Sequence, residues 1–354
     1  MPAHSFVPTA VALAAVPRGS AIESVHGGHI AVVDTAGRIL WQTPGLDEEP
    51  VFFRSALKPI QAIPFVQSGA AARSGLGARA IALACASHAG QPGHIALIRA
   101  LLRTGRLSVD QLGCGVHPPL DPRAAAALIR AGRRPTALYH DCSGKHTAML
   151  LACRERGWPV RGYLEPRHPL QREIKGLVAD FTDLEKSAII SSRDGCNLPA
   201  HAVSLRRMAM AYARLADPAF WRKRGLAERA AAVERITHAV RTHPWLVSGT
   251  GRADLRLMRA AGGRLFSKVG AEAVWCVGIP EAGLGLAMKI RDGTNRAAPA
   301  ILAEALRQTC LLDATTCRRF LESAEQTIRT GDGAIVGTYR PVFKLIRAER
   351  RKWT

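Results

Sequence analysis

Arg54-Ser55-Ala56-Leu57-Lys58 is the stretch on which the fold assignment of this 354-residue chain depends. It places a serine three residues before a lysine, and residues three apart lie on one face of a helix. Burial or a second cation can keep a lysine amine neutral, and a neutral amine can take the proton of a serine hydroxyl. An isolated match to this spacing is typical of an ordinary helix start, so its meaning depends on the rest of the chain.

Strand patterns lie at both ends of the chain, and helical patterns fill the middle. A β-hairpin is predicted at 28–42, around the turn Asp34-Thr35-Ala36-Gly37, and further strands at 264–267, 273–278 and 284–290. Helices are predicted to start at Ser55 and to span roughly 121–132, 145–156, 169–182, 203–216 and 226–241. Pro64 should kink the first helix, and Asp292-Gly293-Thr294 should cap a final long helix through Leu306.

Because strands at the two ends need partners, we expect them to pair in one antiparallel sheet. The predicted fold class is α/β, more narrowly α+β, a sandwich of that sheet with the helical middle of the chain. No linker or repeat divides the sequence, so residues 1–354 are expected to form one domain. The basic tail at 345–354 is expected to be solvated.

The net charge of +21 first suggests a nucleic-acid partner. The basic excess, however, is mostly arginine spread along the chain, and aromatic residues make up only 5% of it. Surfaces that bind single-stranded nucleic acids interleave basic residues with stacking aromatics. We therefore expect no nucleic-acid partner.

Eight cysteines without a Cys-x-x-Cys pair favour free thiols in a reducing cytoplasm. The apolar run at 6–16 lacks the basic residues that begin a signal peptide, so it is interpreted as a buried first strand. No uncharged apolar run reaches the length needed to span a bilayer. We expect a cytoplasmic protein with no membrane partner.

Residues 85–90, Cys-Ala-Ser-His-Ala-Gly, place Ser87 in a turn of small residues, where backbone N–H groups could hold an oxyanion. Residues 247–254 form a glycine-rich loop suited to a small polar ligand, and Lys268 lies on a predicted strand near a glycine. Serine enzymes with Ser-x-x-Lys carry Lys-Thr-Gly on such a strand. Here the triplet is Lys-Val-Gly and no Ser-Asp-Asn occurs, so an ordinary β-lactamase or transpeptidase is disfavoured.

Two cysteines lie in loops beside other ligand-type side chains. Cys142 precedes Lys145 by three residues at a helix start, and Cys196 follows Asp194 in a turn. Two thiolates with one more nitrogen donor would make a zinc site with an open position, as catalytic zinc prefers. Spacing alone favours the alternative, two inert buried cysteines.

Seven motifs follow one another along the chain, at 54–59, 85–90, 142–146, 194–199, 248–252, 267–272 and 289–297. Together they resemble the rhizobial-type, zinc-containing bacterial L-asparaginases of the asparaginase II family, over roughly residues 8–340. The resemblance implies a fold like that of serine β-lactamases and glutaminases. It also implies a homodimer and the hydrolysis of L-asparagine to L-aspartate and ammonia.

The same resemblance implies roles for single residues. It gives catalytic roles to two serine–lysine pairs, Ser55 with Lys58 and Ser87 with Lys268. It gives a zinc ion three ligands, one of them a lysine that must lose its proton to bind metal: Cys142, Lys145 and Cys196. It places four residues at the substrate: Arg54, His146, Asp194 and Arg252. Asp254 is an acid in an otherwise matching loop, and its role stays open.

Both serine–lysine pairs are intact, which favours an amidohydrolase in which repulsion between the two lysines keeps one amine neutral. Either Ser55 or Ser87 could be acylated. The alternatives are a glutaminase or other serine–lysine amide or ester hydrolase, and an inactive homologue that binds an amino acid. Sequence does not separate asparagine from glutamine, since one methylene is worth only about 1–3 kcal/mol in a pocket.

Overall fold

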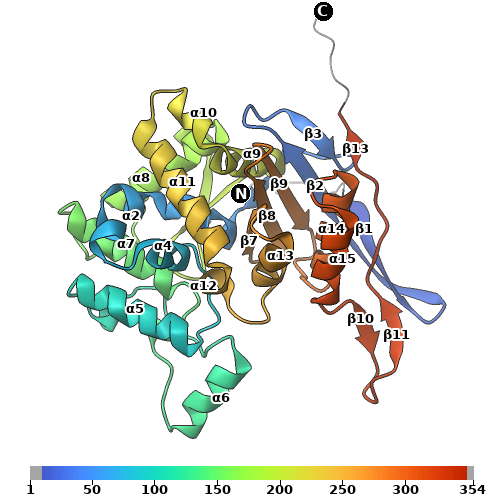
Figure 1. Cartoon of the computed structure of the whole chain (residues 1–354), viewed down its shortest axis with the longest axis horizontal. Coiled ribbons are helices and arrows are strands. Elements are labelled where there is room, and N and C mark those ends of the chain that lie inside the picture. The colour runs from blue at the N-terminus through green and yellow to red at the C-terminus, as the bar shows by residue number, and fades with distance from the viewer. Residues whose placement is uncertain (1–9, 349–354) are drawn as a thin grey trace, which may run out of the picture.

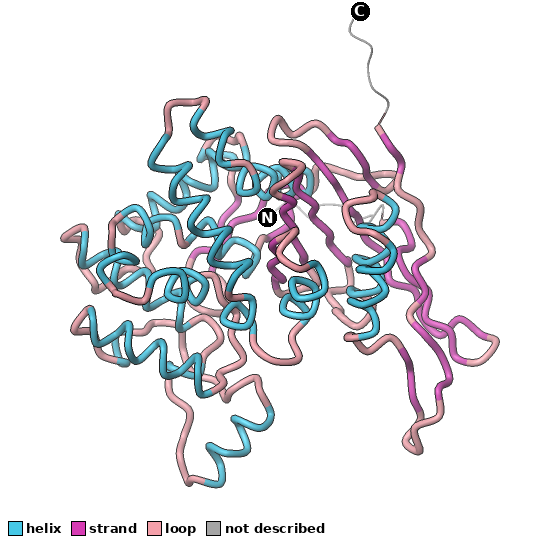
Figure 2. The backbone as a smooth tube through the Cα atoms, in the orientation of Figure 1, coloured by secondary structure: helices cyan, strands magenta, loops and turns pink. Residues whose placement is uncertain are grey.

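The computed structural model describes residues 10–348, with strands gathered in one half and most helices in the other (Figure 2). The largest sheet is antiparallel, with the main order β12-β1-β2-β9-β8-β7; β3 also pairs with β2, and β13 pairs with β3. Its strands are β1 (Val11–Arg18), β2 (Ala21–Val33), β3 (Ile39–Gln42), β7 (Phe266–Gly270), β8 (Val274–Ile279), β9 (Leu284–Ile290), β12 (Arg340–Pro341) and β13 (Ile346–Arg347).

The centre of this sheet joins the two ends of the chain. β2 pairs with β9, from Gly28 opposite Ile290 to Val33 opposite Gly285. On its other edge, the first half of β2 pairs with β1 and its last residues pair with β3. The predicted hairpin at 28–42 is therefore present, and the expected pairing of N-terminal and C-terminal strands is confirmed.

Helices cover both faces of the sheet. They are α9 (Leu205–Ala216), α13 (Ala253–Ala261), α14 (Ala298–Gln308) and α15 (Ala314–Glu322) (Figure 1). α9 packs closely on β9, because a Cβ on Gly285 would lie only 2.0 Å from the carbonyl oxygen of Ala209. Gly285 pairs with Gly278, so Trp275, three residues from Gly278, faces the opposite side, where its ring meets Phe320 of α15.

The helical half contains the remaining helices: α1 (Lys58–Gln61), α2 (Ile63–Gln67), α3 (Ala70–Arg73), α4 (Gly77–Ala84), α5 (Pro92–Thr104), α6 (Pro122–Arg130), α7 (Ser143–Glu155), α8 (Pro169–Thr182), α10 (Pro218–Arg222), α11 (Ala227–Thr242) and α12 (Pro244–Ser248). α7 is its central helix, since every residue from Ser143 to Cys153 is buried. The helices predicted within 121–241 are confirmed, and Asp121 caps α6 by accepting a hydrogen bond from the N–H of Ala124.

A three-stranded antiparallel sheet links the two halves near the candidate site. Its order is β4 (Pro50–Phe52), β6 (Pro199–Ser204) and β5 (Ile190–Arg193). A separate hairpin pairs β10 (Thr327–Arg329) with β11 (Ile335–Thr338). Because β4 runs antiparallel to β6, the chain that leaves β4 after Phe52 runs towards the tip of the β5–β6 hairpin.

Two expectations about helix boundaries need correction, and a third agrees with the structure. The helix predicted from Asp292 to Leu306 begins only at Ala298, because Asp292 accepts a hydrogen bond from the N–H of Thr294 in a turn instead. It is not the last helix, since α15 follows it. Pro64 does interrupt the first helix: α1 ends at Gln61, and α2 begins at Ile63.

The two chain ends lie partly outside the described residues. The predicted first strand at 6–16 is seen from Val11 onward, and residues 1–9 are not described. The basic tail at 345–354 begins as strand β13, with Ile346 opposite Gln42, whereas residues 349–354 lie outside the described residues.

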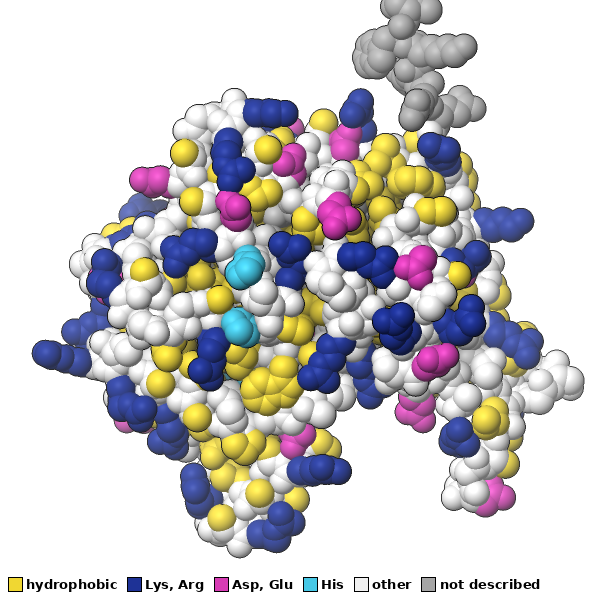
Figure 3. All heavy atoms as spheres, viewed as in Figure 1, with side chains coloured by type: hydrophobic (Ala, Val, Ile, Leu, Met, Phe, Trp, Pro, Cys, Tyr) yellow, Lys and Arg dark blue, Asp and Glu magenta, His cyan; other side chains and the backbone are white. Residues whose placement is uncertain are grey.

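None of the helices within residues 10–348 is long and apolar enough to cross a membrane. On the face shown in Figure 3, lysine and arginine side chains are scattered among apolar and acidic ones. The excess positive charge is thus distributed over this face and does not gather in one stripe.

Candidate active site

The first candidate serine lies in a strained turn between β4 and α1. Arg54 has φ of +50°, a left-handed conformation that is uncommon outside glycine and that clusters at functional sites. Ser55 follows in the short 3-10 turn Arg54–Leu57 and is half-buried. The turn lies directly against β7, because a Cβ on Gly270 would be 2.6 Å from the carbonyl oxygen of Phe53. Ser55 is thus held at the edge of the main sheet.

Replacing Gly270 by alanine is expected to lower stability by about 1–3 kcal/mol, because the new methyl group would push the Ser55 turn off β7. Thermal unfolding measures the effect. Gly176→Ala is the matched control, since its Cβ would meet only the flexible end of Lys186 and alanine favours the helix. An unchanged melting temperature in Gly270→Ala would contradict the close approach.

The second candidate serine contacts a buried lysine. Lys58 is 0% exposed, and its Nζ lies 2.8 Å from Ser87 Oγ and 2.6 Å from the carbonyl oxygen of Ala86. Two backbone hydrogen bonds fix the turn that carries Ser87. The N–H of Ser87 donates to the backbone carbonyl oxygen of Val247, and the N–H of His88 donates to that of Asp141. A serine hydroxyl and a lysine amine are thus fixed within hydrogen-bonding distance, away from solvent.

The serine–lysine contacts differ from the pairs that the resemblance implies. Within residues 10–348, Lys58 forms no hydrogen bond with Ser55, because its side chain turns towards Ser87. Lys268 bonds neither serine; its Nζ donates to the carbonyl oxygen of Val269 and contacts Asp254 at 3.3 Å. Burial lowers the pKa of Lys268, Asp254 opposes that shift, and nearby Lys58 adds to it. The two lysines therefore belong to one buried cluster with different partners.

A carboxylate braced by two histidines lies next to Lys58. Asp141 Oδ2 is 3.7 Å from Lys58 Nζ, and its other oxygen is 3.1 Å from His140 Nδ1 and 3.5 Å from His117 Nε2. These three side chains could converge on a cation. The hydrogen bond to Asp141, however, raises the pKa of His117. Burial opposes a similar shift at His140, but the contact with Asp141 helps to raise its pKa to about 9, which favours protonated rings that donate to the carboxylate. The group is therefore best described as a brace that holds Asp141 against Lys58.

The three residues expected to bind zinc converge in the structure. Cys142, Lys145 and Cys196 are buried, and Lys145 Nζ lies 3.1 Å from Cys196 Sγ. Cys142 is the N-cap of α7, Lys145 lies in the first turn of that helix, and Cys196 is in the tip of the β5–β6 hairpin. Segments far apart in sequence thus bring two sulfur atoms and one nitrogen together.

The charges in this group suit a soft divalent cation. The contact with Cys196 holds the pKa of Cys142 well below its usual value, with burial opposing and the ammonium of Lys145 assisting the shift. Burial tends to lower the pKa of Lys145, but the two sulfur atoms outweigh it and raise that pKa. Two sulfur atoms and one nitrogen are donors that zinc can take, and zinc would have to displace the protons that these groups hold.

His146 lies one residue beyond Lys145 and is fully buried. Its Nδ1 is 2.6 Å from the hydroxyl of Tyr163, and that hydroxyl accepts the N–H of Gly113. Among the residues described, His146 Nε2 is a buried ring nitrogen without a hydrogen-bond partner. Burial, with Lys145 nearby, holds the pKa of His146 well below its usual value, so the ring is neutral.

An ion pair joins the Ser55 turn to the β5–β6 hairpin. Arg54 Nε lies 2.9 Å from Asp194 Oδ1, and both side chains remain partly exposed. Arg252, by contrast, is the N-cap of α13 on the sheet side and lines a cavity of about 200 Å³ with Asp254 and Trp275. The residues expected at the substrate thus fall in more than one place around the two lysines.

A sequence model of the L-asparaginase II family matches residues 14–341. The chain belongs to the L-asparaginase II family. The chain is therefore a hydrolase that acts on amides, and its family suggests L-asparagine as the substrate. In a direct comparison, no curated protein matches the chain.

Sequence reasoning missed the brace around Asp141 in this asparaginase. Asp141 precedes Cys142 in a motif rich in ligand-type residues, which was a usable signal for a role at the site. His117 offered none, because only the fold brings its loop next to Asp141. Tyr163 was likewise missed, since its hydroxyl meets His146 across a separate loop.

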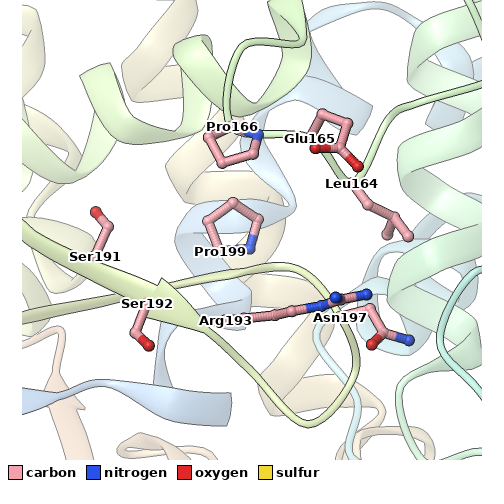
Figure 4. Close-up of a pocket in the computed structure, with 8 residues that line it drawn as sticks. All are labelled: Leu164, Glu165, Pro166, Ser191, Ser192, Arg193, Asn197 and Pro199. Atoms are coloured by element: carbon pink, nitrogen blue, oxygen red, sulfur yellow. The ribbon is translucent and has the colours of Figure 1, made fainter.

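A cavity of about 220 Å³ lies on the outer side of the Asp194–Cys196 turn. Figure 4 shows Arg193 extending towards Asn197, with Leu164, Glu165 and Pro166 above and Pro199 between Pro166 and Arg193. None of the four serine and lysine residues expected to be catalytic lines this cavity. It therefore lies along the β5–β6 hairpin and is not lined by the expected serine–lysine pairs.

Proposed function

We propose that this asparaginase hydrolyses the side-chain amide of L-asparagine through an acyl-enzyme, with Lys58 as the general base. The observation that carries the proposal is the 2.8 Å contact between Lys58 Nζ and Ser87 Oγ in a buried site. A serine becomes a useful nucleophile when a base lies within hydrogen-bond reach of its hydroxyl. Ser87 is therefore the first candidate for acylation.

The atoms balance in two half-reactions. Ser87 Oγ attacks the side-chain carbonyl carbon while its proton passes to Lys58 Nζ, and the resulting ammonium then protonates the leaving nitrogen. Ammonia departs and leaves an ester between the aspartyl group and the serine. Water then attacks the ester as Lys58 takes its proton, and that proton returns to the serine oxygen as L-aspartate leaves.

Ser55 is the second candidate for the acylated serine. Ser55 is half-buried and thus more accessible to substrate than Ser87, which is only 6% exposed. It follows Arg54, whose backbone is strained, in the turn that lies against β7. Hydrogen bonds of a catalytic base are often loose before substrate binds. In this alternative mechanism Ser55 attacks the amide, and Ser87 stays hydrogen-bonded to Lys58, which accepts the proton.

Trapping the acyl group tests the covalent step. With hydroxylamine present, we expect L-asparagine to give the β-hydroxamate of aspartate, and peptide mapping of acid-quenched enzyme to find the ester on Ser87. An ester on Ser55 would move the nucleophile to the second candidate. Turnover without hydroxamate and without any ester would contradict serine acylation.

We propose that Cys142, Lys145 and Cys196 hold one zinc ion. When bound, zinc would supply a fixed positive charge beside the site and could polarise an oxygen of the substrate. The side chains themselves tie the start of α7 to the β5–β6 hairpin, which carries Asp194. His146 supports this corner through Tyr163, and its free Nε2 can bond to substrate.

We also propose that Arg54 and Asp194 bind the charged ends of the amino acid, Arg54 its α-carboxylate and Asp194 its α-ammonium group. Their mutual contact keeps both oriented when the substrate is absent. Asp194→Asn is therefore expected to raise KM for L-asparagine at least about 10-fold, with a smaller change in kcat. Asp180→Asn, at an exposed ion pair with Arg229, is the charge-matched control. A loss confined to kcat would contradict this role.

The pH profile follows from an amine as the base. Activity should rise from neutral pH into the alkaline range, because Lys58 accepts a proton only when it is neutral. Burial lowers the pKa of the neighbouring Lys268, and Asp254 opposes that shift. Turnover at saturating L-asparagine measures the profile. A maximum near roughly pH 5–6 would contradict an amine base.

The last proposals concern the fold family, the oligomeric state and the cellular location. We propose a serine β-lactamase- and glutaminase-like sandwich, a homodimer, and a cytoplasmic location. The helix–sheet–helix arrangement supports the first. All eight cysteines are free and seven of them are buried, which supports a reducing compartment. Glutaminase activity is the alternative that a direct comparison of the two amides would reveal.

A further inference from the structure

Asp254 is a buried carboxylate that the reaction above leaves without a role. It lies in the first turn of α13, and its side chain is only 3% exposed. Its oxygens accept hydrogen bonds from Ser267 Oγ at 2.7 Å and from the N–H of Val269 at 3.0 Å. Ser267 in turn accepts the indole N–H of Trp275 at 2.7 Å. The carboxylate is thus fixed by α13, β7 and β8 together.

This carboxylate faces Lys268, whose Nζ lies 3.3 Å from Asp254 Oδ2. Within residues 10–348, Asp254 is the one carboxylate in ion-pair contact with Lys268. Burial acts most strongly against protonation of the amine and lowers the pKa of Lys268; Asp254 opposes this shift, and two cations add to it, Lys58 and Arg252. The nearby thiols and phenol are neutral, because burial raises their pKa values: Cys85, Cys276 and Tyr212.

Lys58 has a different environment from Lys268. Its two hydrogen bonds go to neutral oxygens, those of Ala86 and Ser87. Its nearest carboxylate, Asp141, is 3.7 Å away and also contacts His117 and His140. Two ammonium groups in one buried cluster repel each other, so a proton is retained best where a carboxylate is closest and least shared.

We propose that Asp254 is a positioning residue that holds Lys268 as an ammonium ion, so that Lys58 is the amine left neutral to take the serine proton. This inference rests on the proposed function, and it divides the work of the two lysines. Lys268 supplies a fixed positive charge beside the reacting groups, and Asp254 maintains both the charge and the position of Lys268. The proton of the serine hydroxyl can then pass only to Lys58.

Titration of the lysine side chains by NMR tests the charge of Lys268 without relying on activity. The chain contains only nine lysines, so labelling at Cε gives a small set of signals. Lys268→Arg identifies the signal. In the zinc-loaded wild-type enzyme, we expect Lys268 to be an ammonium ion at pH 7, and Asp254→Asn to lower its titration midpoint by at least about one pH unit.

Kinetics test whether that charge matters for turnover. In Asp254→Asn, the alkaline limb of kcat should move to lower pH with the midpoint of Lys268, which a purely structural defect would not cause. Asp217→Asn removes a charge from a carboxylate that caps α10, and it should move neither limb nor midpoint. Ser267→Ala keeps the Asp254 charge and should move the midpoint much less.

A neutral Lys268 at pH 7 in the wild type would overturn the proposal, even if Asp254→Asn failed to fold. An unchanged midpoint in folded Asp254→Asn would overturn it too. If Asp254→Asn shifted the titration midpoint of Lys268 but not the alkaline limb of kcat, the charge of Lys268 would have no role in turnover. Failure of the wild type to hydrolyse any amide would refute the proposed function separately, since the NMR titration would still report the charge.

Discussion

Ser87→Ala is expected to lower kcat for L-asparagine by about 10³-fold or more while the protein stays folded. The hydroxyl is the group that Lys58 contacts at 2.8 Å, whether it attacks the amide itself or bonds the amine that accepts the proton. Ser55→Ala is expected to cost at least about 10²-fold, because its turn carries the second candidate hydroxyl. Steady-state turnover together with thermal unfolding separates loss of chemistry from loss of fold.

Ser74→Ala is the matched control for these variants. Ser74 is also buried, and its hydroxyl donates only to the carbonyl oxygen of Ala71. It should keep near-full turnover. If Ser87→Ala also kept near-full turnover, Ser87 would be a structural residue, and the Lys58–Ser87 contact would not carry the reaction.

Cys196→Ala is expected to abolish stoichiometric zinc and to lower turnover at least about 10²-fold. The protein purified without chelator should contain about one zinc per chain, and Cys142→Ala should lose it in the same way. The reason is that each replacement leaves two of three donors, and the hairpin that carries Asp194 loses its tie to α7. Elemental analysis and turnover of the same samples measure both effects.

Cys153→Ala is the control for thiol loss. Cys153 is buried, and burial raises its pKa to about 12, so it is a neutral thiol away from the Cys142 group. It should keep its zinc. Stoichiometric zinc that persists in a Cys142→Ala/Cys196→Ala double variant would rule out this ligand set.

Much of the fold followed from local sequence patterns. The hairpin at 28–42 and the helices between 121 and 241 formed where the turn residues and apolar spacing placed them. The helix expected from Asp292 begins only at Ala298, because an Asp-Gly-Thr segment suits a turn as well as a helix cap, and here it forms a turn. The strands β12 and β13 were missed because their few residues pair only with distant segments, β1 and β3, and the hairpin of β10 with β11 was missed as well.

The site was predictable as a set of residues but not as a set of contacts. Motif order identified the lysines and serines, yet spacing suggested that Lys58 would face Ser55. The structure instead turns Lys58 towards Ser87 and gives Lys268 to Asp254. Such partners are set by how α4, α13 and β7 pack, and a linear pattern carries no record of that packing.

The proposed reaction releases ammonia from L-asparagine with Lys58 as the base. It is tested by ammonia release from L-asparagine, L-glutamine and other amino-acid amides, and by acid release from small esters, for the wild type and for Lys58→Met. We expect the wild type to prefer L-asparagine, and Lys58→Met to be folded and at least about 10³-fold slower. If the wild type released no ammonia from any amide, the proposed reaction would be wrong. If Lys58→Met were as fast as an active wild type, Lys58 would not be the base.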